Sequence, residues 1–121
     1  MPITESVQFA LQILEMNPDW LYIYDLVERR NIYENNKSLA FLGYNQQEFN
    51  EMKDGILEKL LHPSDISKIF DYHNRIRSSE EKLFSVEYRV KHKSGEYRVF
   101  SSNDSPFQID EKGHATQIIG T

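Results

Sequence analysis

The stretch LFSVEYRVKHKSGEYRVF, residues 83–100, decides the fold that we predict for this chain. On its first arm apolar side chains alternate with polar ones, as they do in a strand with one buried face. The apolar positions are Phe84, Val86, Tyr88 and Val90. Ser94 and Gly95 follow as a two-residue turn, so the stretch predicts a long β-hairpin. An apolar sheet face of this length needs a covering layer, which the rest of the chain must supply.

The pairing across the turn determines which residues of the second arm face the core. If Lys93 pairs with Glu96, then Val90 lies opposite Val99 and the apolar face continues. We therefore expect five residues of the hairpin to be buried against the longest helix. They are Phe84, Val86, Tyr88, Val90 and Val99.

The same register turns two polar residues of the second arm inward. Ser101 and Asn103 would lie opposite Tyr88 and Val86, where packing alone favours apolar groups, and they would line a small polar pocket. A β-bulge near Ser101 would instead turn both side chains outward. The sequence leaves the two alternatives open.

Outside the hairpin, the pattern predicts helices that fall between two groups of strands. Helices are expected at 4–16, 36–42, 46–50 and 63–77, with a further turn at 56–61, and strands at 20–26, 31–35 and 115–121. Asp104 to Pro106 is expected to form a bend before residues 107–109. The predicted fold is therefore α+β, a five-stranded antiparallel sheet with short helices covering one face, plus an N-terminal helix.

Composition limits the possible functions. The chain has 121 residues, 39% of them hydrophobic, which suits one domain with one core. A formal charge of -5 argues against nucleic acid or an anionic membrane as a partner. The absence of cysteine excludes disulfides, thiolate nucleophiles and cysteine-ligated metals. No membrane span or signal peptide is visible, so we expect a soluble, cytoplasmic protein.

Four motifs, in order, resemble the PAS sensor family, in the PAS fold-3-like variant of bacterial multi-sensor kinases. They are IYENNKSLAFLGYNQQEF, with Asn35, Gly43 and Tyr44; LHPSD, with His62, Pro63 and Asp65; EYRVKHKSGEYRVF; and EKGHATQIIGT. The resemblance covers residues 17–121 and leaves 1–16 as a flanking helix. It implies a sensory or dimerisation module upstream of an output domain, either a histidine kinase or a cyclic-dinucleotide enzyme. The chain stops where the family runs on into a linker, so we expect a piece of a longer protein.

His73 is the sharpest candidate for a ligand-binding residue. On a helical wheel it shares one face with Ile69, Phe70 and Ile76, which would direct its imidazole into a cavity. It could bind a ligand or a haem iron, or it could be a buried histidine bonded to a backbone carbonyl. The resemblance implies that an axial histidine would fall near Ile69 or Phe70, and the flavin-binding segment of light-sensing members has no counterpart. We therefore expect no haem, flavin or metal.

The candidate pocket residues are Phe70, His73, Val86, Tyr88, Ser101 and Asn103. His62 is expected to bond free backbone N–H groups at a helix start, and Asp65 to stabilise the first turn of that helix. His92 and His114 are expected to lie in solvated turns. No phosphate loop, nucleophile elbow or histidine pair is present, so catalysis by this fragment is not expected.

The N-terminal helix has two apolar sides. Val7, Ala10, Leu11 and Leu14 gather on one side, which can pack on the domain. Phe9, Ile13 and Met16 lie close to the opposite side and predict a homodimer interface. A neighbouring domain of the full protein is the alternative partner.

The favoured interpretation is a non-catalytic sensory module of a bacterial signalling protein, with a histidine kinase as its output. Two alternatives stay open. One is a cone-shaped α+β isomerase or cyclase, which would need a His–Asp or Tyr–Asp pair in its pocket. The other is a dimerisation scaffold with a filled core and no ligand.

Overall fold

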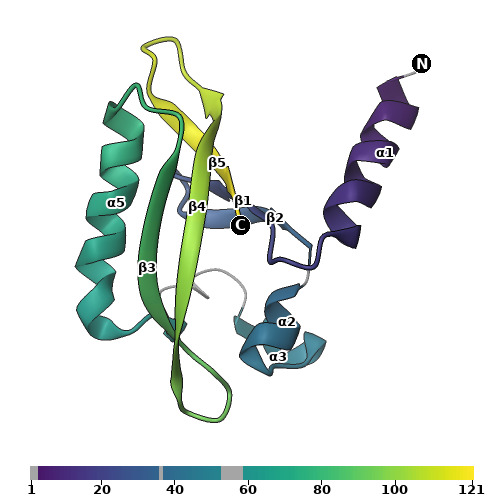
Figure 1. The fold of residues 1–121 in the computed structure, drawn as a ribbon, viewed down its shortest axis with the longest axis vertical. Coiled ribbons are helices and arrows are strands. Elements are labelled where there is room, and N and C mark those ends of the chain that lie inside the picture. Colours follow the sequence, from purple (N-terminus) through teal and green to yellow (C-terminus); the bar gives the residue numbers. More distant parts are fainter. Residues whose placement is uncertain (1–2, 36, 53–58) are drawn as a thin grey trace.

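The computed structural model describes residues 3–35, 37–52 and 59–121. Its centre is an antiparallel sheet of five strands in the order β2-β1-β5-β4-β3 (Figure 1). The strands are β1 (Tyr22–Asp25), β2 (Arg30–Glu34), β3 (Phe84–Lys91), β4 (Tyr97–Ile109) and β5 (Ala115–Gly120). The predicted α+β fold with five antiparallel strands is confirmed. β4 runs without a break through Asp104 and Pro106, where the sequence predicted a bend.

In the chain, the described helices other than the N-terminal one come between β2 and β3. They are α2 (Lys37–Leu42), α3 (Gln46–Met52), the short 3₁₀ helix η1 (Pro63–Asp65) and α5 (Ile66–Ser78). The helix α5 contacts β3 and β5, while α2 and α3 lie at the lower end of the sheet (Figure 1). The first half of the turn predicted at 56–61, residues 56–58, lies outside the described residues.

The core has two clusters between the helices and the sheet. The first holds Tyr24, Leu26, Tyr72, Ile76, Phe84, Ala115 and Ile118. The second holds Leu42, Leu60, Leu61, Ile69, Tyr88 and Val90. Val86 is half-buried and packs on both clusters. Because α5 contributes to both, its amphipathic face joins the two halves of the core.

Polar side chains hold the start of α5. His62 accepts a hydrogen bond from the backbone N–H of Ser64 at 3.0 Å, as the sequence predicted. Asp65 is buried and binds Arg89 of β3 through Nε at 3.0 Å and Nη2 at 2.9 Å. The hydrogen bonds from Arg89 hold the pKa of Asp65 well below its usual range. Asp65 therefore ties α5 to the hairpin rather than capping the helix.

The hairpin register differs from the prediction by one residue. Lys91 pairs with Tyr97 and Val90 with Arg98, and the backbone N–H of His92 bonds Glu96 O at 2.8 Å, so His92 and Glu96 close a three-residue loop rather than a two-residue one. Gly95, with a φ of +96° and its N–H on His92 O, completes this loop and sets the register. The backbone N–H of Lys93 is thereby left to bond Leu42 O of α2 at 2.9 Å.

This slip exchanges the two faces of the second arm. Val99, predicted to be buried, is 67% exposed, and Ser101 and Asn103 also point outward. No bulge interrupts the pairing of β3 with β4, so the longer loop causes this exchange of faces. Ser102 and Asp104 take the inward positions and are buried. Phe84, Tyr88 and Val90 on the first arm are buried as predicted, whereas Val86, also predicted to be buried, is half-buried because it borders the cavity.

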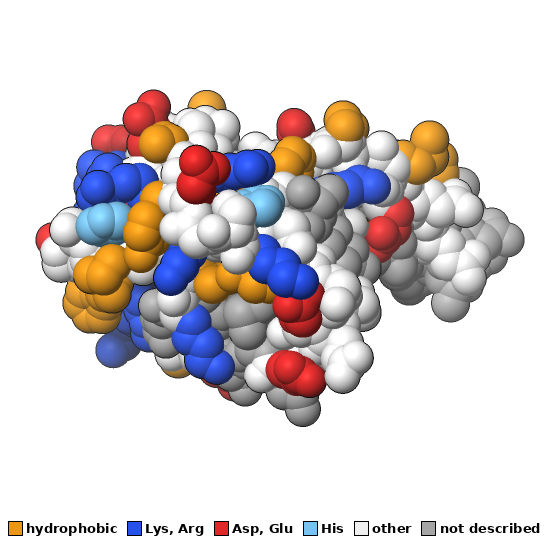
Figure 2. Space-filling view, turned by 90° about the horizontal axis from the view of Figure 1, so that it is seen from below, with side chains coloured by type: hydrophobic (Ala, Val, Ile, Leu, Met, Phe, Trp, Pro, Cys, Tyr) orange, Lys and Arg blue, Asp and Glu red, His pale blue; other side chains and the backbone are white. Residues whose placement is uncertain are grey.

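The helix α1 (Ile3–Met16) stands apart from the sheet at the right of Figure 1. Hydrophobic side chains lie on the surface of this projecting part in Figure 2. Phe9, Ile13 and Met16 are 61%, 53% and 81% exposed. Leu14 is half-buried, and the side chains of Val7, Ala10 and Leu11 lie outside the described ones. In the described part of the chain, no helix is long and apolar enough to span a bilayer.

Candidate ligand-binding cavity

A cavity of about 50 Å³ lies between α5 and the inward face of the sheet. Its aromatic wall comes from Trp20, Tyr22, Tyr24, Tyr72 and Tyr88. Its polar wall includes His73, Ser102 and Asp104. Trp20 precedes β1, Tyr72 and His73 lie on α5, and Ser102 and Asp104 lie on β4, so elements far apart in the chain form the walls.

Asp104 is the centre of the polar wall. Its side chain is only 2% exposed and accepts hydrogen bonds from the phenol groups of Tyr22 and Tyr72, the latter at 2.5 Å. Burial raises the pKa of the Asp104 carboxyl, although the two phenol hydrogen bonds oppose that rise. Burial and the neighbouring carboxylate also raise the pKa of Tyr22, so its phenol keeps its proton.

Gly120 makes the contact between Tyr22 and Asp104 possible. It lies on β5 between these two residues, paired with Tyr22 on one side and Asp104 on the other. A Cβ atom at Gly120 would lie 2.0 Å from Asp104 Oδ1 and 2.7 Å from the Tyr22 hydroxyl. The missing side chain therefore leaves the space in which side chains of two non-adjacent strands meet.

His73 lies against the same cavity and is 6% exposed. Its ring packs against Tyr24 at a centroid distance of 4.9 Å and against Tyr72 at 5.8 Å. Burial, with a smaller contribution from the charge of Arg29, lowers its pKa to about 4, so the imidazole is neutral at pH 7. Its Nδ1 atom is buried without a hydrogen-bond partner among the described residues. The backbone carbonyl considered as its partner does not bond this nitrogen.

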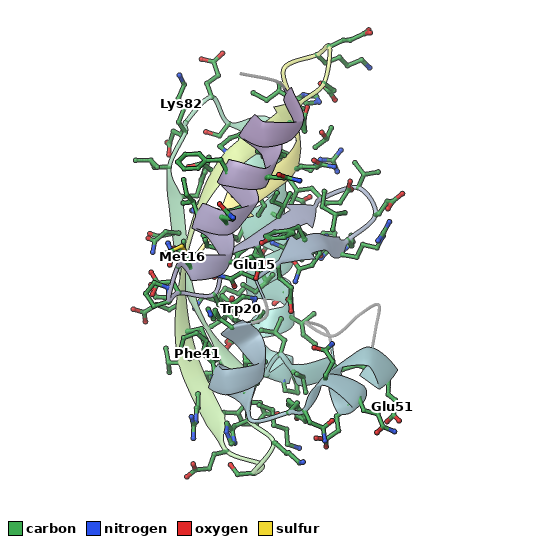
Figure 3. The ribbon with its side chains drawn as sticks, turned by 90° about the vertical axis from the view of Figure 1, so that its right-hand side faces the viewer. Glu15, Met16, Trp20, Phe41, Glu51 and Lys82 are labelled. Atoms are coloured by element: carbon green, nitrogen blue, oxygen red, sulfur yellow. The ribbon has the colours of Figure 1, made fainter. Side chains whose placement is uncertain are left out.

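A second, more open groove of about 230 Å³ adjoins the cavity. Trp20, Tyr22, Tyr88 and Ser102 line both hollows. The groove is also bordered by Phe41 and Phe100, and the Phe100 ring meets Trp20 edge-on at 6.0 Å. Figure 3 shows Trp20 and Phe41 one above the other on the side where α1 ends. The groove and the cavity are therefore separated only by side chains that line both.

The predicted pocket residues separate into two groups. His73, Val86 and Tyr88 line the cavity. Phe70 is exposed and lies under the guanidinium of Arg29, because it is on the outer side of α5. Ser101 borders only the outer groove, and Asn103 is exposed.

Sequence reasoning missed four residues that line the cavity. These are Tyr22, Tyr72, Ser102 and Asp104. The alternation of the second arm would have placed Ser102 and Asp104 inward if the longer hairpin loop had been recognised. No local signal pairs Tyr22 with Asp104, since 82 residues separate them.

Asn35 connects the region around the cavity to α1. It is buried at the end of β2, and its amide donates to the carbonyls of Leu14 at 3.1 Å and Asp19 at 2.8 Å. Its carbonyl oxygen accepts from the backbone N–H of Leu21 at 3.0 Å. One side chain therefore holds the segment that joins α1 to β1 and carries Trp20.

A family model described as PAS fold matches residues 31–121. No curated protein sequence matches the chain. Among solved structures, the PAS domain of a protein from Colwellia psychrerythraea matches with a TM-score of 0.71 and 18% identity, over 95% of this chain and 92% of that chain.

Two further similar structures come from sensor kinases. A domain of a light and redox sensing histidine kinase from Haloarcula marismortui has a TM-score of 0.68 and 17% identity, over 93% of this chain and 94% of that one. A domain of a sensory box histidine kinase/response regulator from Geobacter sulfurreducens has a TM-score of 0.66 and 18% identity, over 98% of this chain and 94% of that one. At these identities the likeness shows the fold alone.

Proposed function

The chain belongs to the PAS family, and on that premise we propose that it is the sensory module of a bacterial signal-transduction protein. Residues 17–121 form the sensing unit, and residues 1–16 form a flanking helix. The module works in the cytoplasm and controls a histidine kinase as its output domain. The support for a kinase is that similar structures are domains of sensor histidine kinases.

The observation that carries this proposal is the His73 nitrogen that has no partner among the described residues, in a cavity that is also lined by a buried carboxyl group. Buried polar atoms are normally hydrogen-bonded, and leaving one without a partner lowers stability. A small molecule that bonds His73 would remove this penalty. Ligand binding therefore explains why the cavity keeps polar walls instead of apolar ones.

The route from the cavity to the output passes through the segment held by Asn35. Trp20 lines the cavity and lies on the segment that the Asn35 amide bonds. A ligand that shifts Trp20 would change how this segment is held, and with it the position of α1. The signal would then appear as altered packing of α1 in a dimer.

The homodimer forms through the outer side of α1, where Phe9, Ile13 and Met16 are exposed. Exposed apolar side chains in a row are disfavoured in water and are typical of interfaces. Sedimentation at micromolar concentration should show a dimer. Changing Phe9 and Ile13 together to Glu should weaken it at least tenfold. Leu83→Glu is the matched control, because Leu83 is equally apolar and exposed but lies away from α1. A monomer before mutation, or equal weakening by the control, would contradict the dimer.

The isomerase or cyclase alternative has one observation in its favour, the Tyr22–Asp104 contact. Against it, PAS domains are generally sensory and non-catalytic, and both oxygens of Asp104 already accept phenol hydrogen bonds. We therefore assign the cavity to binding. The ligand-free scaffold alternative requires no occupant at all.

Native mass spectrometry of the protein purified from cells tests the choice between sensor and scaffold. A sensor should retain a small molecule, seen as a mass difference that disappears on denaturation. The His73→Phe variant should purify without it, because a phenyl ring fills the space but accepts no hydrogen bond. Protein that never carries a ligand, from cells or after exposure to metabolite extract, would favour the scaffold.

A further inference from the structure

We propose that the cavity binds a small organic ammonium ion, held by the carboxylate of Asp104 and by the aromatic rings around it. This inference rests on the proposed sensory function and names the chemical class of its ligand. Three features of the cavity carry it: a buried carboxyl group, an aromatic wall and a free acceptor atom.

The first feature is the buried carboxyl of Asp104. Its side-chain partners are the neutral phenols of Tyr22 and Tyr72, and among the described residues no Lys or Arg forms an ion pair with it. The guanidinium of Arg75 lies over the Tyr72 ring at 5.6 Å and that of Arg29 over the Phe70 ring at 4.9 Å. Neither arginine is among the described residues that line the cavity. Burial raises the pKa of the Asp104 carboxyl because its charged form is costly there, and a cationic ligand would stabilise that charged form.

The second feature is the wall of aromatic rings. Trp20, Tyr22, Tyr24, Tyr72 and Tyr88 line the cavity. The face of an aromatic ring attracts a cation, and several rings around one site are the usual way that proteins bind alkylammonium groups. An anion would meet both this wall and the Asp104 carboxyl, so anionic ligands are disfavoured. A neutral ligand would gain less from the same surroundings.

The third feature is Nδ1 of His73, which is buried and without a partner among the described residues. In the neutral imidazole this nitrogen accepts a hydrogen bond when the proton is on Nε2. An ammonium N–H is a donor that suits both this nitrogen and the remaining lone pairs of Asp104. The two acceptors come from α5 and β4 and both line the cavity, so a ligand with at least two N–H groups could bond to both.

The volume limits the size of the ligand. About 50 Å³ is space for about three or four water molecules. An alkylammonium ion of about four non-hydrogen atoms fits this space, and a longer substituent would extend into the outer groove past Trp20.

The test compares isopropylammonium with 2-propanol, which has the same shape and number of non-hydrogen atoms but no charge. Trp20 is the only tryptophan, so its fluorescence and its indole N–H signal report occupation of the cavity. At pH 7 we expect saturable binding of isopropylammonium, at least tenfold tighter than binding of 2-propanol. Equal or tighter binding of the alcohol, or no saturable response to the ammonium, would overturn the inference.

Two matched variants separate a specific site from general attraction of cations to an acidic protein. Asp104→Asn removes the buried ionisable group. It should weaken the binding of isopropylammonium at least tenfold and change the affinity for 2-propanol by less than twofold. Asp110→Asn makes the same change of net charge at an exposed turn and should leave both unchanged. If Asp104→Asn does not fold, the relative affinities of the parent protein for the two probes still test the inference. A neutral molecule retained in native mass spectrometry would disprove the ammonium ligand and leave the sensory function standing.

Discussion

Replacing Gly120 with Ala should destabilise the domain by breaking the contact between Tyr22 and Asp104. The new Cβ would lie 2.0 Å from Asp104 Oδ1, so one side chain must move. Overpacking costs about 1–3 kcal/mol, and losing a buried hydrogen bond to a charged group costs about 1.5–3 kcal/mol. The reduced entropy of the unfolded chain offsets about 0.4–1 kcal/mol. The expected net loss is about 1.5–5.5 kcal/mol, a large part of the roughly 5–15 kcal/mol that stabilises a small domain.

Urea denaturation of four proteins measures this effect: the parent, Gly120→Ala, Asp104→Ala and the double variant. Removing the Asp104 side chain makes room for the Cβ, so Gly120→Ala should cost at least about 1 kcal/mol less in that background. Gly113→Ala is the control. Gly113 has a φ of +84° and open space around it, so its cost comes from the backbone and should not depend on Asp104. A Gly120→Ala cost that is independent of Asp104, or below about 0.5 kcal/mol, would refute the reasoning.

Three further predictions concern the register, the titration of the cavity and the attachment of α1. Ser102→Leu should lower the free energy of unfolding by about 2–3 kcal/mol, because Ser102 is buried and bonded to a tyrosine, whereas Ser101→Leu should stay within about 0.5 kcal/mol. Stability should fall by up to about 3 kcal/mol as the pH drops from 6.5 to about 4, because burial lowers the pKa of His73 to about 4 and the unfolded chain takes up the proton first. Denaturation of His73→Gln at each pH should lack that part of the slope; an unchanged slope would contradict a neutral buried imidazole. Asn35→Ala should cost at least about 2 kcal/mol and speed proteolysis within residues 17–21, whereas Asn103→Ala on the exposed face of β4 should do neither.

The sequence by itself determined the strands, the long helix and the order in which they come. These are local properties. Alternation along β3 shows which side of that strand is buried, and the spacing of Ile69 and Ile76 shows the inner face of α5. The cap at His62 could also be predicted, because its partner Ser64 is two residues away. His73 could be placed on the inner face of α5 for the same reason.

The tertiary structure alone decided how the polar side chains of the cavity meet. The hairpin register is local: Ser94 and Gly95 suit a two-residue loop, but Gly95, with a φ of +96°, completes a three-residue loop closed by His92 and Glu96, a second loop type that the same residues allow. The bond from the Lys93 N–H to Leu42 O of α2 adds a contact between residues 51 positions apart at this loop. Because side chains alternate with a period of two, a register shift of one residue turns Ser101 and Asn103 outward. Ser102 and Asp104 face the cavity in their place. The meeting of Tyr22 with Asp104 then depends on Gly120 lying between them on a third strand, and only the assembled sheet brings those three residues together.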